Sequence, residues 1–187
     1  MAEHEILLSE LRARLPELHA GDTVSLTGTL YTARDAAHKR LIALLDQGLP
    51  LPADLRNAVI YYAGPTPAHD DLIIGSCGPT TSGRMDVFAP RLIEHGLAGM
   101  IGKGDRRPPV IEAMKRFSAV YFAAIGGAGA VIADCVKSLE VIAFEELGCE
   151  SMKRLEVKGF PAIVAIDTYG SNLYQTGRTA FIRHETV

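Results

Sequence analysis

The chain has 187 residues, of which 48% are apolar and 22% are charged, and this composition excludes a disordered or fibrous protein. Nineteen Lys and Arg residues against 22 Asp and Glu residues leave a formal net charge of -3, so no basic surplus is available for nucleic acid or an anionic membrane. We therefore expect residues 1–187 to form a single domain around one core.

No segment is predicted to cross a membrane or to direct export. The longest charge-free stretch, around residues 118–133, is interrupted by glycines and is shorter than the ~18 apolar residues of a spanning helix. Acidic residues occupy the N-terminal segment where a signal peptide would carry Lys or Arg. Cys77, Cys135 and Cys149 are scattered, which predicts reduced thiols and no local metal site. A cytoplasmic protein is expected.

Apolar periodicity and turn residues predict alternating helices and strands, and therefore a mixed α/β fold. No repeat or linker divides the pattern. In chain order we expect a helix over 5–18, a strand over 23–31, a helix over 33–47, strands over 58–62 and 72–76, a helix over 81–95, a strand over 98–102, a helix over 108–117, a strand over 119–124, a helix over 127–135, and strands over 141–144 and 163–166.

Three segments, residues 31–40, 78–86 and 102–106, concentrate polar and charged residues, and each follows a predicted strand. In open α/β sheets, ligands bind beyond the carboxyl ends of the strands. The three segments are therefore expected to converge on one pocket.

The first segment places Arg34 in the first turn of a helix and His38 one turn later. A cation in that turn opposes the helix dipole, so an anion is expected to meet Arg34. Asp35, His38, Lys39 and Arg40 are interpreted as part of a solvated helix face, with an ion pair between Asp35 and Lys39.

The second segment resembles a phosphate-binding loop only in part, because Arg84 and Met85 replace the required Lys and Ser/Thr. It offers two adjacent hydroxyls, Thr80 and Thr81, near a helix start. We expect one of them to cap that helix and the other to be free for a ligand.

In the third segment Lys103 stands between two glycines, with no neighbouring side chain to shield its ammonium group. Arg34, Arg84 and Lys103 together form a cationic set suited to a small dicarboxylate. The glycine-rich run at 125–130 does not predict a dinucleotide site, because Ile132 stands where a third glycine is required.

These segments resemble the β subunit, or C-terminal domain, of class I iron-sulfur fumarases over roughly residues 20–175. L(+)-tartrate dehydratases share the same region, so the resemblance identifies an iron-sulfur hydro-lyase more firmly than its substrate. The matching motifs are Gly21-Asp22, Thr32-Ala33-Arg34-Asp35-Ala36-Ala37-His38, Gly78-Pro79-Thr80-Thr81-Ser82-Gly83-Arg84-Met85-Asp86, Gly102-Lys103-Gly104, Ile125-Gly126-Gly127-Ala128 and Phe160-Pro161-Ala162-Ile163.

The resemblance implies a swivelling β/β/α domain with mixed sheets and flanking helices. It also implies a 4Fe-4S cluster carried by a separate α subunit, in a hetero-oligomer that interconverts fumarate and (S)-malate, with the iron acting as a Lewis acid. No metal or cofactor ligand is expected in this chain. By similarity, Arg34, Arg84 and Lys103 bind the substrate carboxylates, and Thr80 is the candidate base, with Thr81 able to exchange roles with it.

Two further expectations accompany this assignment. Asp35 and Asp86 are expected, from adjacency in the sequence, to orient Arg34 and Arg84 respectively. The alternatives to a fumarase β subunit are a tartrate dehydratase β subunit and a non-catalytic anion-binding module that reuses the fold without a cluster partner.

Overall fold

The computed structural model of the chain describes residues 1–68, 72–177 and 179, which form a mixed α/β domain. Seven strands join in the order β1-β2-β3-β4-β5-β7-β6. The strands are β1 (Glu3–Leu7), β2 (Thr23–Thr32), β3 (Val59–Tyr61), β4 (Gly99–Gly102), β5 (Val120–Ala123), β6 (Val136–Ala143) and β7 (Met152–Ile166). The helices are α1 (Leu11–Arg14), α2 (Asp35–Asp46), α3 (Ala89–Glu94), α4 (Pro108–Phe117), α5 (Gly129–Cys135) and α6 (Leu173–Thr176), with 3-10 turns η1 (Leu8–Glu10), η2 (Leu15–Glu17), η3 (Ser82–Met85) and η4 (Glu145–Glu150).

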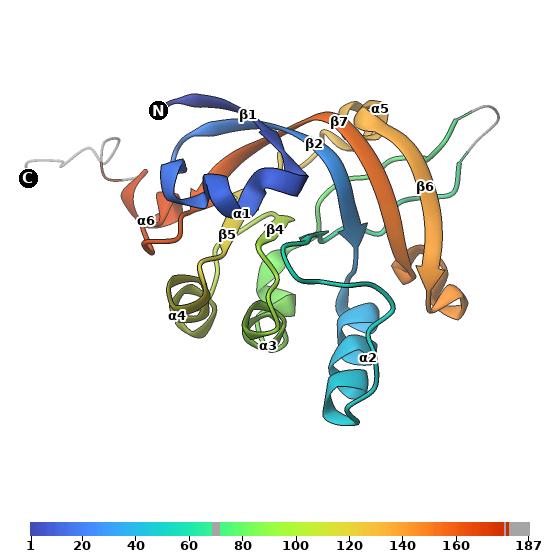
Figure 1. Ribbon diagram of the computed structural model, residues 1–187. Helices are drawn as coiled ribbons and strands as arrows, with labels where there is room; N and C mark the ends of the chain where they lie inside the picture. Colours follow the sequence, from blue (N-terminus) through green and yellow to red (C-terminus); the bar gives the residue numbers. More distant parts are fainter. Residues whose placement is uncertain (69–71, 178, 180–187) are drawn as a thin grey trace, which may run out of the picture.

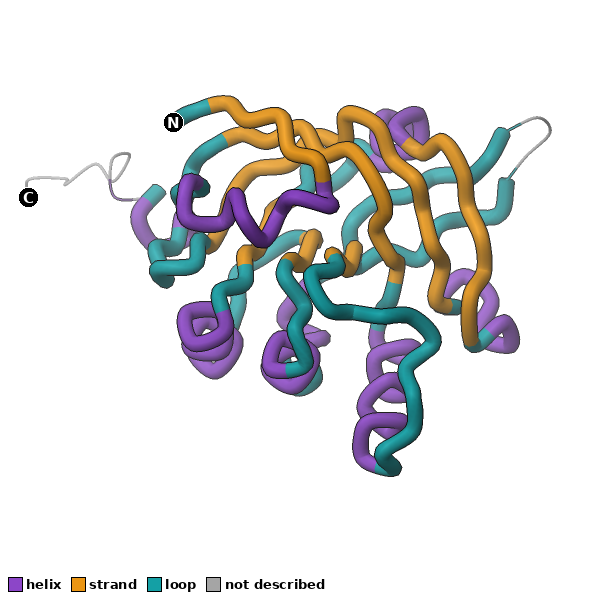
Figure 2. The backbone as a smooth tube through the Cα atoms, viewed as in Figure 1, coloured by secondary structure: helices purple, strands orange, loops and turns teal. Residues whose placement is uncertain are grey.

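The sheet curls back on itself, because β2 also pairs antiparallel with β7. The long strands β1, β2, β7 and β6 therefore lie in one layer, and the short strands β3, β4 and β5 lie beneath them (Figure 1). Helices α2, α3 and α4 form a third layer on the far side of the short strands (Figure 2). From β1 to β5 the neighbouring strands are all parallel.

The short strands are buried on both faces, as expected for parallel strands between two covering layers. In β3, Val59 and Tyr61 pack toward the long strands, whereas Ile60 packs toward the helices. The same alternation places Phe122 of β5 in the first core and Tyr121 in the second. This rigid middle layer supports the segments that leave its carboxyl edge.

Within the described ranges, no helix combines the length and the apolar character needed to span a bilayer.

Most predicted elements are present, but the helix expected over 5–18 is wrong at its start. Residues 3–7 instead form β1, which pairs in parallel with β2 and buries Ile6 while leaving Glu5 and Leu7 exposed. The helical spacing applies only to the following turns around α1. Strand pairing with β2 therefore overrides the local helical pattern.

Three other predictions also differ from the structure. Residues 72–76 form no strand, and Leu72 and Ile73 are exposed. The expected helix over 81–95 is divided into η3 and α3. The strand expected over 163–166 is the end of the much longer β7, whose regular alternation is interrupted at Gly159.

Candidate functional site

The three candidate segments meet at the carboxyl edge of the parallel strands. The first continues from β2 with Arg34, and the third continues from β4 with Lys103. The second does not follow a strand, since residues 72–76 are irregular. It is held at this edge because the backbone N–H of Thr80 donates to the carbonyl of Tyr62, at 2.7 Å, directly after β3.

The two threonines are joined to Lys103 by a strand-like backbone bridge. Thr81 pairs in parallel with Lys103. The N–H of Ser82 donates to the Lys103 carbonyl at 2.9 Å, and the N–H of Lys103 donates to the Thr80 carbonyl at 3.3 Å. Thr80 is half-buried and Thr81 is exposed. The candidate base and one candidate cation therefore belong to the same small structural unit.

Thr81 occupies the N-cap position of η3, but its side chain makes no capping hydrogen bond. The expectation that one of the two hydroxyls caps a long helix is wrong for Thr81. The reason is that η3 is a single 3-10 turn, and its first N–H, that of Ser82, is already bound to the Lys103 carbonyl. The Thr81 hydroxyl is not used by the helix.

Arg34 is the N-cap residue of α2 and faces a carboxylate from a distant part of the chain. Its Nη2 lies 3.4 Å from Oε1 of Glu150, and the other oxygen of Glu150 accepts the N–H of Ala36 at 3.2 Å. Arg34 thus already faces one carboxylate of the protein itself, whereas its expected contact with a ligand anion stays a prediction. Glu150 could not be predicted from the sequence, because it lies 114 residues from Ala36 and no local motif indicates that it is near Arg34.

The Arg34 guanidinium also packs closely against Gly64. A Cβ atom at position 64 would lie 2.8 Å from Nη1 and 3.0 Å from Cδ of Arg34, so a side chain at this position would displace the guanidinium. Nε of Arg34 is buried and has no hydrogen-bond partner among the described residues. The position of Arg34 is therefore constrained on several sides while part of its donor capacity is unused.

Arg84 binds Asp35 through two nitrogens, with Nε 2.9 Å from Oδ1 and Nη2 2.8 Å from Oδ2. Asp86 binds Arg106 instead. The expected pairs of Asp35 with Arg34 and Asp86 with Arg84 are therefore wrong. Side chains of residues one or two apart in a helical turn point in different directions, so adjacency in the sequence does not make them partners.

His38 is fully buried, which corrects its assignment to a solvated helix face. Its Nδ1 donates to the carbonyl of Arg34 at 2.9 Å, and its ring packs against those of Tyr62 and Phe88. Burial lowers the pKa of His38 to about 4. Asp35 likewise pairs with Arg84 rather than with Lys39. His38 is neutral at pH 7 and supports the start of α2 that carries Arg34.

Lys103 differs from the two arginines, because it forms no ion pair with any residue that the structure describes. Its side chain is exposed and extends beside Gly126, where an added Cβ would lie 3.9 Å from Nζ. The Lys103 ammonium is exposed and both neighbouring residues in the chain are glycines, so it is accessible to a carboxylate from outside.

The cysteines do not gather into a metal site within the described residues. Cys77 is buried, and burial raises the pKa of its thiol to about 12, which disfavours the thiolate that a metal needs. Cys135 and Cys149 are also free. Across residues 1–68, 72–177 and 179, no three His, Cys, Asp or Glu side chains are grouped to hold a metal. The described residues therefore offer no ligand set for an iron-sulfur cluster.

Comparison with known proteins shows which sequences this chain resembles. A family model described as "Fumarase C-terminus" matches residues 2–177. The chain is 38% identical over 169 residues to "Fumarate hydratase 2" of Leishmania major, covering 89% of this chain and 30% of that protein. It is 39% identical over 170 residues to "Fumarate hydratase class I, anaerobic" of Escherichia coli, covering 90% of this chain and 31% of that protein.

A third relative has a comparable length. It is the "Putative L(+)-tartrate dehydratase subunit beta" of Methanocaldococcus jannaschii, 38% identical over 165 residues, with 85% of each chain covered. The chain thus spans less than a third of the two fumarate hydratases and most of the tartrate dehydratase subunit.

Proposed function

The chain belongs to the fumarase C-terminus family, and from this premise we propose that it is the β subunit of an iron-sulfur fumarate hydratase. In this proposal it contributes the carboxylate-binding half of an active site, and a cluster-bearing α subunit contributes the other half. The complex interconverts fumarate and (S)-malate. The relatives that bear this name are about three times longer, and the relative of matching length is named a subunit.

The bridge between Thr81 and Lys103 is the observation that carries the proposal. It joins the backbone of Thr80 and Thr81 to that of Lys103, whose ammonium has no ion pair among the described residues, on an exposed edge of the fold. One carboxylate of a small diacid would bind Lys103, and the other would bind Arg34 and Arg84. Charge-assisted hydrogen bonds of this kind contribute about 1.5–3 kcal/mol each.

In the dehydration of (S)-malate, the C3–H and C2–O bonds break, a carbon-carbon double bond forms and water leaves. Thr80, or Thr81 in its place, is the candidate group that takes the C3 proton. A threonine hydroxyl is a weak base, and a positive charge nearby favours its deprotonated form. Lys103 is a candidate for that charge, because its backbone is bonded to that of Thr80.

The exposure of this edge supports a site shared with another chain. Arg84 retains half of its side-chain exposure, and Thr81 and Lys103 are exposed. A hydro-lyase site must exclude bulk water, so a partner is needed to cover it. The 4Fe-4S cluster would belong to that partner, since the described residues of this chain offer no ligand set.

We extend the proposal to the swivelling β/β/α class and to a cytoplasmic hetero-oligomer. The three layers of the fold support the first part (Figure 1). The free thiols of Cys77, Cys135 and Cys149 are compatible with a reducing compartment.

The test is to purify this chain together with a cluster-bearing α chain and to assay the complex on (S)-malate and on L-tartrate. Turnover of malate by the complex, and by neither chain alone, is the expected result. Turnover of tartrate alone would favour a tartrate dehydratase β subunit, which the subunit relative of matching length supports. A colourless chain that acquires no partner and no activity would favour the anion-binding module.

A further inference from the structure

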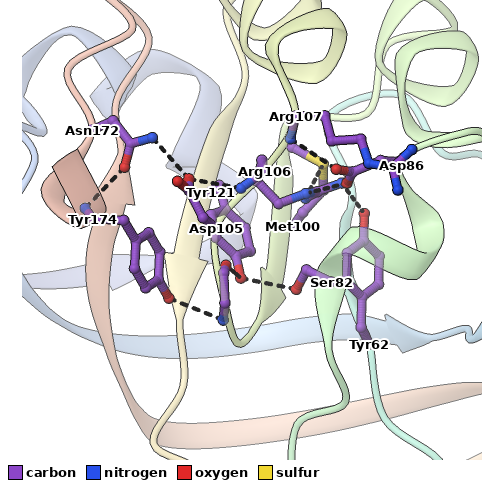
Figure 3. A network of polar contacts seen from close by, with 11 residues as sticks. Tyr62, Ser82, Asp86, Met100, Asp105, Arg106, Arg107, Tyr121, Asn172 and Tyr174 are labelled. Carbon is purple, nitrogen blue, oxygen red and sulfur yellow. Dashed lines mark hydrogen bonds and ion pairs between the residues drawn. The ribbon is translucent and has the colours of Figure 1, made fainter.

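A buried ion pair connects the two segments that carry Arg84 and Lys103. Nε of Arg106 donates to Oδ1 of Asp86 at 2.7 Å, and both side chains are almost completely buried (Figure 3). Asp86 directly follows η3, which includes Arg84, and Arg106 lies on the loop that begins with Lys103. The pair therefore joins two loops that are separate in the sequence.

The surroundings of Arg106 hold its guanidinium in one orientation. The group lies 5.3 Å from the ring centre of Tyr62 and 4.9 Å from that of Tyr121, and Nη1 contacts the sulfur of Met100 at 3.4 Å. The second oxygen of Asp86 accepts the backbone N–H of Arg107 at 2.8 Å. A flat cation between two aromatic rings has little freedom to move.

A second set of bonds ties the same loops together beside the ion pair. The Tyr121 hydroxyl donates to the Gly104 carbonyl at 2.8 Å and lies 2.8 Å from Oγ of Ser82 (Figure 3). On the other side of the loop, the Gly104 N–H donates to the Tyr174 hydroxyl, and Asn172 donates to Asp105. Gly104 and Asp105, which follow Lys103, and Ser82, which follows Thr81, are thus held by the side chains of Tyr121, Tyr174 and Asn172.

Stability alone is a weak reason for such a pair. Two charges lose hydration on burial, and well-packed apolar residues in their place are often neutral or stabilising. What the pair does provide is a fixed separation between the loops, since neither loop is part of a continuous strand at this point.

We infer that Arg106 is a positioning residue, which, through Asp86, sets the register between the Thr80–Arg84 segment and Lys103. This inference rests on the proposed function, because its consequence is the spacing of two groups that bind one diacid. Displacement of a binding group by about 1 Å costs on the order of 100-fold in rate.

The experiment uses the complex with the cluster-bearing α chain and compares Arg106→Lys, Arg106→Met and the apolar double variant D86L/R106M. The control is Leu15→Ala, which opens a cavity in the other core and leaves these loops untouched. Each complex is measured for melting temperature, kcat and KM on (S)-malate. Amide hydrogen exchange at Ser82 and Lys103 reports the bridge between the loops.

For R106M and the double variant we expect kcat/KM to fall on the order of 10- to 100-fold, with KM raised, and faster exchange at both amides. R106K should recover part of the loss. Leu15→Ala should lower the melting temperature without changing kcat or KM of the folded complex. The inference is overturned if kinetics in all variants follow melting temperature, or if both amides stay protected in R106M.

A wild-type complex that does not turn over malate would refute the proposed function by itself. In that case the exchange arm still decides whether Arg106 holds the two loops in register, since it needs no substrate.

Discussion

Arg84 and Asp35 form a two-nitrogen ion pair between η3 and the first residue of α2. A proposed substrate cation is therefore already oriented by a carboxylate before any ligand binds. Because Arg84 is half exposed, the pair is expected to contribute little to folding and more to the direction of the guanidinium.

Asp35→Asn tests this separation of roles. The free energy of unfolding should fall by less than about 1 kcal/mol, as is typical of exposed pairs. KM for (S)-malate should rise several-fold, because the neutral amide loses the charge that attracts the Arg84 guanidinium. Denaturant unfolding of the chain and steady-state kinetics of the complex measure the two effects. An unchanged KM would show that Asp35 does not orient Arg84.

Glu150 places a carboxylate at the N-terminus of α2, where it also faces Arg34. Glu150→Gln retains an oxygen for the Ala36 N–H but loses the charge. We expect a loss of about 0.5–1 kcal/mol of unfolding free energy at low salt, which 1 M salt should largely abolish. The matched control is Glu146→Gln, whose exposed pair with Arg40 should contribute nothing measurable. Equal effects of the two substitutions would contradict this account of Glu150.

His38 predicts a pH dependence of stability. Its pKa is lowered from 6.5 to about 4 by burial, so the folded protein disfavours the charged form that the unfolded chain accepts. The unfolded state then binds more protons, and stability decreases as the pH falls from about 6.5 toward 4, by up to roughly 3 kcal/mol.

Replacing His38 by Gln, which keeps an N–H donor for the Arg34 carbonyl, should flatten the stability profile between pH 6.5 and 4. His95→Gln is the control, because that side chain is exposed. Urea unfolding at several pH values measures the slopes. A His38→Gln profile as steep as that of the wild type would assign the dependence to other groups.

Thr80 can be tested by comparing Ala with Ser. Thr80→Ala removes the hydroxyl and should lower kcat with little change in KM, whereas Thr80→Ser retains the hydroxyl and should keep much of the activity. The same two substitutions at Thr81 show which threonine faces the substrate. Wild-type kinetics for Thr80→Ala would exclude Thr80 as the base.

The sequence predicted those parts of the fold that depend on local pattern. The run of apolar residues in β4 and the proline-initiated helix α4 are found where they were expected, because each is determined by its own residues. The segment at 3–7 was assigned to a helix, since nothing within it reveals that β2 will lie beside it. Much of β7 was missed because Gly159 interrupts its alternation and Pro161 is an unfavourable strand residue.

For the candidate site, the sequence predicted which loops carry the charged residues but not how these residues pair. Lys103 and the threonines could be found from glycine and hydroxyl patterns. The partners Glu150 and Asp86 act across long sequence separations, so only the folded chain reveals them. Asp35 was assigned to Arg34 because the two are adjacent, but in the structure Asp35 pairs with Arg84. Adjacent residues in a helical turn point in different directions and so pair with residues elsewhere in the fold.

Hydration of fumarate by a complex that contains Lys103→Ala tests most directly whether Lys103 binds a substrate carboxylate. We predict that kcat/KM falls roughly 10- to 100-fold, the equivalent of one charge-assisted hydrogen bond, with KM raised and kcat lowered together. Lys39→Ala, which removes an exposed lysine from α2, should leave both constants unchanged. If kcat/KM of the Lys103→Ala complex stays within about twofold of the wild type, the loss is much smaller than removal of such a bond would cause. That result would contradict a role of Lys103 in binding the substrate.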